Sequence, residues 1–222
     1  SDLPSVTVRP LQEKDIDAVA AMEVKAWHEY YSQYEGFYNI VKGAVTEDKV
    51  AADWREFVAR DQDAQGPMVL GDDREAFVVF LEGRPVGIGA VSAYKTGVEV
   101  WKPVDDYIRQ PDGTLPRLAK YQNLYVHQDH RGYGVGHFLN LARADYMLAK
   151  GYTGLFLAPF ADAAKTMAFH EKNGLIKVHE YLSLSTYADD RRVKIACMVN
   201  LDLEGMREHW RKQLDRKQAE GK

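Results

Sequence analysis

The sequence predicts an α/β (α+β) fold in which a mixed, mostly antiparallel central sheet of about seven strands carries helices on both faces. Three observations lead to this prediction. Two apolar runs, 76–81 and 86–91, flank the turn at 82–85, which is typical of a hairpin. Strand-like and helix-like segments then alternate between residues 121 and 174, which implies at least one parallel crossover. Two further strand-like segments, at about 177–186 and 193–201, complete the sheet.

The N-terminal part is predicted to hold one short strand and two helices. Alternation at 6–8, just before Pro10, indicates the strand. The segment after Asp15 is predicted as an amphipathic helix because its apolar residues recur near helical spacing: Ile16, Val19, Ala20, Trp27 and Tyr30. A second helix is predicted from about Thr46, since threonine is a good N-cap and two acidic residues follow it.

The C-terminal half is predicted to continue with a strand at 121–127, a helix at 137–150, a strand at 155–158 and a helix that Asp162 caps and that runs to 173–174. Gly151 and Gly174 are placed to end the two helices. The preceding stretch, 102–120, contains three prolines and is predicted as a long loop of the kind that covers a functional site.

The chain of 222 residues is long for one domain and short for two. We therefore expect a single domain over 1–202, with 203–222 as a helical extension of the same domain. In this extension Met206, Trp210 and Leu214 recur every four residues among charges. Such a narrow apolar face either docks onto its own domain or forms a subunit interface, so a homodimer is one of the two expected outcomes.

Composition restricts the partners. Hydrophobic residues make up 45% and the net charge is -4 with interspersed signs, so a packed core is expected and nucleic acid is not a favoured partner. One cysteine, Cys197, excludes an intrachain disulfide and favours the cytoplasm. No apolar run is long enough to cross a bilayer, so no membrane is expected, and no His or Cys pair has the spacing of metal ligands.

A glycine-rich loop is the main functional signal. Its residues lie between a predicted strand and a predicted helix: Arg131, Gly132, Tyr133, Gly134, Val135 and Gly136. Alternating glycines expose backbone N–H groups where the helix dipole also favours an anion, so a diphosphate would fit. The loop is not a P-loop, because neither Lys nor Ser/Thr follows its last glycine, and it misses the dinucleotide fingerprint by one residue. A simple tight turn is the alternative.

The segment 125–136 resembles the strand-loop-helix of GNAT acyltransferases, whose loop reads Gln/Arg-x-x-Gly-x-Gly/Ala. Arg131, Gly134 and Gly136 fill the defining positions. The segment 168–175 is similar to the family's later helix end, and 8–10 with Asp15 is similar to its opening strand and helix. The resemblance implies a GNAT-like sheet and an N-acetyltransferase that uses acetyl-CoA as the acyl donor, without a metal.

The resemblance also implies positions for acetyl-CoA. Backbone groups of Leu124 and Val126 would pair with the pantetheine arm, and residues 131–136 would hold the diphosphate. The Val126 N–H would face the thioester oxygen. Where the family usually has a Tyr as the general acid, this chain has His170, and a neutral imidazole is a poor acid. We therefore expect His170 to orient the sulfur or to donate a proton; simple packing at the helix end is the alternative.

The acceptor is left open as a small-molecule amine or a peptide amine. The resemblance places one wall of its site after the first helix, where Trp27, Tyr30 and Tyr31 could bind it, although these rings could also pack under a loop. For the general base, Glu99, His127 and Asp129 are equal candidates. A non-catalytic acyl-CoA sensor is the main rival function, and an interaction domain that does not bind CoA is the third.

Overall fold

Seven strands form one sheet in the order β1-β2-β3-β4-β5-β7-β6. The structure is a computed structural model, and it describes residues 5–32, 45–59, 73–183 and 193–221. The strands are β1 (Val6–Pro10), β2 (Arg74–Leu81), β3 (Arg84–Ala93), β4 (Leu118–Val126), β5 (Gly154–Leu157), β6 (Ile176–Ser183) and β7 (Val193–Asn200). Only β4 and β5 pair in parallel, and the other neighbours are antiparallel. The predicted fold class is confirmed.

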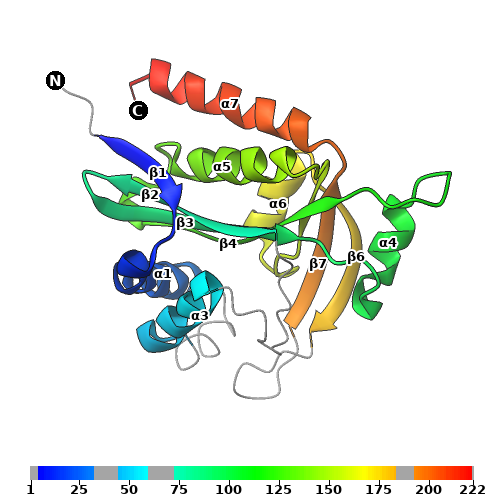
Figure 1. Cartoon of the computed structure of the whole chain (residues 1–222), viewed down its shortest axis with the longest axis horizontal. Helices are drawn as coiled ribbons and strands as arrows, with labels where there is room; N and C mark the ends of the chain where they lie inside the picture. The colour runs from blue at the N-terminus through cyan, green and yellow to red at the C-terminus, as the bar shows by residue number, and fades with distance from the viewer. Residues whose placement is uncertain (1–4, 33–44, 60–72, 184–192, 222) are drawn as a thin grey trace.

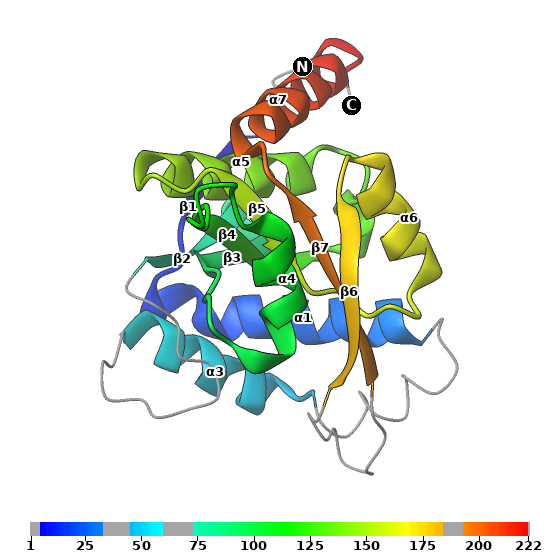
Figure 2. The ribbon, with the colours of Figure 1, turned by 90° about the vertical axis from the view of Figure 1, so that its right-hand side faces the viewer.

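Helices cover both faces of this sheet (Figure 1). One face, which we call the α1 face, carries α1 (Ile16–Tyr31) and α3 (Glu47–Ala59). The opposite face, the α5 face, carries α5 (Val135–Ala149), with α7 (Leu203–Ala219) packed on α5. The short helix α4 (Lys102–Ile108) lies against β6 (Figure 2), and α6 (Ala164–Lys172) follows β5.

Apolar clusters hold these layers together. On the α1 face, α1 and α3 pack on β2 and β3, with Val19, Trp54 and Ile88 buried. Beyond α1, the same face is covered near β5 by α4, whose Val104 and Ile108 pack with Phe156. On the other face, α5 and α7 share a cluster with β4, β5 and β7, and the start of α5 packs on β2 and β3 through Val135 and Leu139.

The prediction of a long loop at 102–120 is wrong. The stretch contains α4 and the first residues of β4, which begins at Leu118. Pro103 suits the first turn of a helix, because the N–H that it lacks would have no partner there. Val104 and Ile108 lie one turn apart and are both buried. Proline was therefore a helix start here and not a break.

β4 separates from β5 partway along its length. The parallel pairing covers only Leu118↔Gly154, Ala119↔Leu155 and Lys120↔Phe156. On its other side β4 stays paired with β3 as far as Gly87↔Val126, across a bulge between Ile88 and Ala90. A bulge bends a strand and increases its twist. Beyond residue 120, β4 has no strand paired with it on the β5 side among the described residues, and we call this unpaired side the gap.

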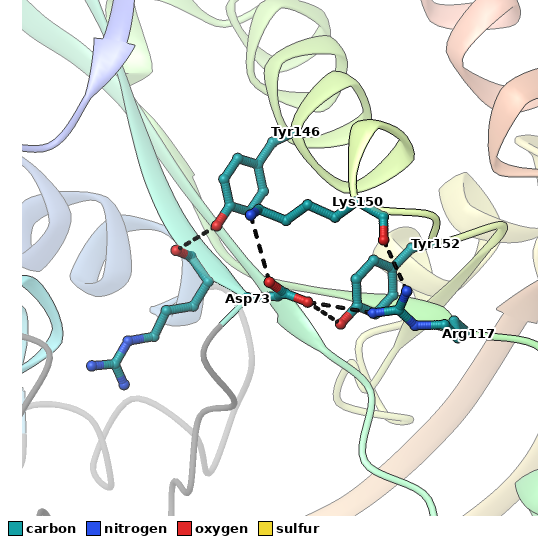
Figure 3. Close-up of polar contacts among 6 residues, drawn as sticks. Asp73, Arg117, Tyr146, Lys150 and Tyr152 are labelled. Carbon is teal, nitrogen blue, oxygen red and sulfur yellow. Dashed lines mark hydrogen bonds and ion pairs between the residues drawn. The ribbon is translucent and has the colours of Figure 1, made fainter. Parts of the chain in front are cut away.

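The opposite end of α5 is fixed by a polar cluster around Asp73 (Figure 3). The Tyr152 hydroxyl donates to Asp73 Oδ2 at 2.7 Å, and Arg117 and Lys150 form ion pairs with the same carboxylate. Tyr146, on α5, donates to the Arg74 carbonyl at 3.1 Å. This cluster joins the starts of β2 and β4 to the end of α5, and so fixes the helix whose other end carries the glycine loop.

Candidate functional site

The glycine loop leads directly into α5. Gly132 and Gly134 both have φ of 87°, in the left-handed region that favours glycine, and Gly134 is the N-cap of α5. At Gly136 an added Cβ would meet no atom within 4 Å. The start of α5 therefore presents backbone N–H groups at the positive end of the helix dipole, without side chains from the three glycines.

The C-terminal helix α7 supports this loop from behind. Lys217 Nζ donates to the Gly132 carbonyl at 2.6 Å, and a Cβ at position 134 would lie 2.9 Å from Leu214 Cδ1. In a trans peptide the C=O and the next N–H point in opposite directions. Since the Gly132 carbonyl faces α7, the Tyr133 N–H points away from α7. This contact was not predicted from sequence, because it joins residues 85 positions apart.

The end of β4 is continuous with the loop. The His127 N–H donates to the Val86 carbonyl in β3 at 2.8 Å, so the preceding Val126 N–H points the other way, into the gap beside β4. The Val126 carbonyl accepts from Arg131 Nε at 3.2 Å. Leu124 lies at the bulge with its side chain 41% exposed. The structure thus brings the expected acetyl-CoA residues, 124, 126 and 131–136, into one continuous line.

His170 lies on α6, which packs through Met167 into the cluster shared with α5. Burial lowers the pKa of His170 to about 4, so its ring is neutral at pH 7. The ring also contacts Phe169, with centroids 5.7 Å apart. A neutral imidazole can donate or accept a hydrogen bond but carries no spare proton. The helix begins at Ala164, and its N-cap is Ala163 rather than the expected Asp162.

The expected acceptor residues lie at the C-terminal end of α1. The Trp27 ring lies 5.3 Å from that of Tyr125 on β4 and 6.5 Å from that of Phe160, measured between centroids. Tyr30 is partly buried one turn away, and the side chain of Tyr31 falls outside the described residues. Tyr125 and Phe160 were missed from sequence, although Tyr125 alternates with the two residues expected to hold pantetheine.

A buried carboxyl group, that of Glu23, lies on α1 one turn before Trp27. Glu23 is 5% exposed, accepts a hydrogen bond from Trp54 Nε1 at 2.5 Å, and also interacts with the Trp27 indole. Burial raises its pKa to about 7. Glu23 therefore links α3 to the helix that carries Trp27.

The three candidate bases differ in their surroundings. Glu99 is exposed in a short 3₁₀ helix, Glu99–Trp101. His127 caps another, Gln128–His130, because its Nδ1 accepts from the Asp129 N–H at 3.2 Å. That contact leaves the proton of a neutral His127 ring on Nε2. The geometry does not single out one of the three as the base.

Among the residues placed, no group of three or more His, Cys, Asp or Glu side chains could hold a metal ion. None of the helices in the described ranges is both long enough and apolar enough to span a membrane.

Comparison with known proteins agrees with this geometry. Residues 27–175 match the family model described as acetyltransferase (GNAT) family, whereas no curated protein matches the sequence. An N-acetyltransferase from Staphylococcus aureus Mu50 is 17% identical, with a TM-score of 0.56 over 90% of this chain and 99% of that one. A PaiA N-acetyltransferase from Thermoplasma acidophilum, solved with coenzyme A, is 15% identical, with a TM-score of 0.56 over 89% and 99%.

A third structure, the ribosomal-protein-alanine N-acetyltransferase from Brucella melitensis, is 16% identical, with a TM-score of 0.56 over 88% of this chain and 99% of that one. At such identities the structures show a shared fold. The family model covers more than half of the sequence, and it includes the end of β4, the glycine loop and α5. The resemblance seen in the sequence is thereby confirmed: the chain belongs to the acetyltransferase (GNAT) family and is an acyl-CoA-dependent N-acyltransferase.

Proposed function

We propose that the chain transfers the acetyl group of acetyl-CoA to the amine of a small molecule or a peptide. The observation that carries the proposal is that the unpaired side of β4 leads along the chain into the glycine loop at the start of α5. An extended pantetheine arm that ends in a diphosphate would suit this arrangement, because the N–H groups of an edge and of a helix start are ready donors. The cytoplasmic location and the formation of a homodimer stay predictions.

In the proposed reaction the neutral amine attacks the thioester carbonyl carbon. A C–N bond forms, the C–S bond breaks, and the proton lost by the amine balances the one that the departing thiolate takes up. The Val126 N–H, which faces the gap, is placed to donate to the carbonyl oxygen as it gains charge. A thiol has a pKa of about 8.5, so the thiolate leaves without a strong acid.

The surroundings of His170 favour the expected role of orienting the sulfur over that of donating a proton. With a pKa of about 4 the imidazole is almost entirely neutral at pH 7. It can hold a hydrogen bond to the sulfur but is a weak proton donor. We therefore propose that His170 orients the thioester. On the acceptor side, Trp27 together with Tyr125 supports an aromatic wall, with Tyr30 and Tyr31 proposed beside it.

The loop's role can be tested by one pair of variants at an open position. Gly136→Glu adds a negative charge where the structure leaves room, and Gly136→Gln adds the same bulk without charge. We expect calorimetry to show acetyl-CoA binding to the wild-type protein and binding to Gly136→Glu that is at least about tenfold weaker than to Gly136→Gln. Equal affinities of the two variants would contradict a diphosphate at this loop.

The rival sensor function makes a different prediction from the same protein. The neutral His170 is the observation that favours it, because a lost acid is compatible with binding alone. A sensor would bind acetyl-CoA and release no CoA thiol with any amine. Acetylated product from one acceptor would exclude the sensor, and a folded protein that binds no acetyl-CoA would exclude both functions.

A further inference from the structure

Two side chains on β4 lie on the same face of the sheet, next to the point where the strand leaves β5. Tyr121 faces α5, since its hydroxyl donates to the Asn140 carbonyl at 2.9 Å. Residues on either side of it in a strand point to the opposite face. Lys120 and Gln122 therefore lie on the α1 face, where Lys120 pairs with Phe156 and Gln122 with Ala90.

Lys120 is a partly buried cation without an ion pair among the described residues. Among the described residues its one close partner is the ring of Trp101, with Nζ 4.9 Å from the centroid. Burial lowers the pKa of this ammonium group, and no carboxylate in the described ranges offsets the effect. A cation held over an aromatic ring is only partly compensated for the water that it loses.

Arg143 is a buried structural cation whose guanidinium has several hydrogen-bond acceptors within the protein. Arg143 is 1% exposed, yet its guanidinium donates to three carbonyls, those of Leu139, Ala90 and Gln122, and to Asn140 Oδ1. These acceptors surround the bulge between β3 and β4. Lys120 has no comparable set of acceptors in the described ranges, so its charge is left available for a ligand.

Gln122 adds a second donor on the same face. Its side-chain nitrogen is buried and has no hydrogen-bond partner in the part of the chain that the structure describes. Buried polar groups are rarely left without a partner in native proteins. An unpaired amide donor and an unpaired ammonium two residues apart on one strand are complementary to a negatively charged group.

The location of this pair relates it to the acceptor. Trp27 and Tyr125, the aromatic wall, lie on the same α1 face, because Tyr125 pairs with Ile88 in the α1 cluster. We propose that Lys120 and Gln122 bind a carboxylate of the acceptor, so that the substrate is an amine that also carries a carboxylate. This inference rests on the proposed acetyl transfer, and it narrows the acceptor class within it.

The positive charge of Lys120 also suits the attack of an amine on the thioester. An ammonium group that approaches a fixed cation has its pKa lowered, which favours the neutral amine that attacks the thioester. A polycationic amine would be repelled at this face, whereas an amino carboxylate would be held by its anionic end. The site thus selects for an anion near the amine and against a second cation.

The test compares matched acceptors in a thiol-release assay with saturating acetyl-CoA. Phenylalanine, methionine and glycine are each paired with their own carboxamide, which removes the negative charge and also makes the amine less basic. Each carboxylate-to-carboxamide ratio of kcat/KM is therefore compared between wild type and variant. We expect Lys120→Met to lower this ratio at least about tenfold in the best pair, while the Kd for acetyl-CoA stays within about twofold.

A matched control is Lys177→Met, which removes an exposed lysine on the edge strand β6 and should keep the ratio. Lys120→Met is expected to fold, because it keeps the aliphatic stem beside Trp101 and removes only the charge. A carboxylate-to-carboxamide ratio that is the same in Lys120→Met as in wild type would overturn the inference and leave acetyl transfer intact.

If none of these amines is acetylated, binding decides the inference. The three carboxylates are titrated by calorimetry into the wild-type protein saturated with CoA. Binding of at least one that is lost in Lys120→Met supports the inference, and no binding of any of them overturns it. A wild-type protein that does not bind CoA at all would refute the proposed function itself, so the two failures can be told apart.

Discussion

Glu23 shows how one buried residue can connect stability to the candidate acceptor wall. A carboxylate that is removed from water prefers its neutral form, and the two indole N–H groups of Trp54 and Trp27 offset only part of this preference. The protonated acid and the carboxylate can both accept these hydrogen bonds. Glu23 therefore holds Trp27 in place while its charge state changes near neutral pH.

This arrangement predicts a pH-dependent stability with a definite sign. The folded protein holds the Glu23 proton up to a pKa of about 7, whereas an ordinary glutamate loses it near 4.5. Between these values the native state binds more protons than the unfolded state, so stability falls as the pH rises. Glu23→Gln should remove this fall, a gain of up to about 3 kcal/mol for the variant over wild type between pH 5 and pH 8.

Urea denaturation at pH 5, 6.5 and 8 measures this difference. The control is Glu180→Gln, a change at an exposed position on the edge strand β6, which should leave the pH profile of stability as it is in wild type. A Glu23→Gln profile parallel to that of wild type would show that Glu23 is already ionised at pH 5.

Among the elements, α7 has the most direct bearing on the glycine loop. Lys217 fixes the Gly132 carbonyl on the α7 side, and Leu214 packs so closely that a Cβ at position 134 would require its side chain to shift. The Tyr133 N–H is thereby held on the opposite side, where the proposed diphosphate would lie. A cation on the carbonyl side of a peptide also polarises its N–H, which strengthens the bond to an anion.

We therefore expect Lys217→Met to weaken acetyl-CoA binding by about three- to tenfold. Calorimetry with S-acetylpantetheine, which lacks the diphosphate, should give nearly the same affinity for variant and wild type. Lys212→Met removes an exposed lysine from the same helix and serves as the control. Equal losses for both ligands would mean that Lys217 supports the fold generally and not the loop.

For the whole molecule, local features could be predicted and long-range ones could not. The hairpin around Gly83 and the loop at 131–136 depend on residues close in sequence, so their patterns were sufficient. α4 was missed because Pro103 resembles a chain break until its burial partners are known. Lys120 and Gln122 gave no signal, because their shared face and unpaired state follow from strand register and from packing between distant segments.

The packing of the C-terminal helix α7 determines whether the molecule unfolds as one unit. Leu203, Met206, Trp210 and Leu214 are buried against their own chain, and Trp210 stacks on Tyr121 of β4 with ring centroids 5.8 Å apart. The same apolar cluster includes residues of β4, β5 and β7. Because α7 completes a core shared with the centre of the sheet, we expect 1–202 and 203–222 to form one cooperative domain.

Trp210→Ala tests this expectation. Removing a buried tryptophan should lower the free energy of unfolding by about 3–5 kcal/mol, and the single transition should be kept. Far-ultraviolet circular dichroism and tyrosine fluorescence, followed during denaturation, should give coincident curves in wild type and variant. Val6→Ala, at an edge position that is 44% exposed, should change stability by less than about 0.5 kcal/mol. An early separate transition in wild type, with the sheet still folded, would instead make α7 an independent appendage, and the contact of Lys217 with the loop would then be optional for the fold.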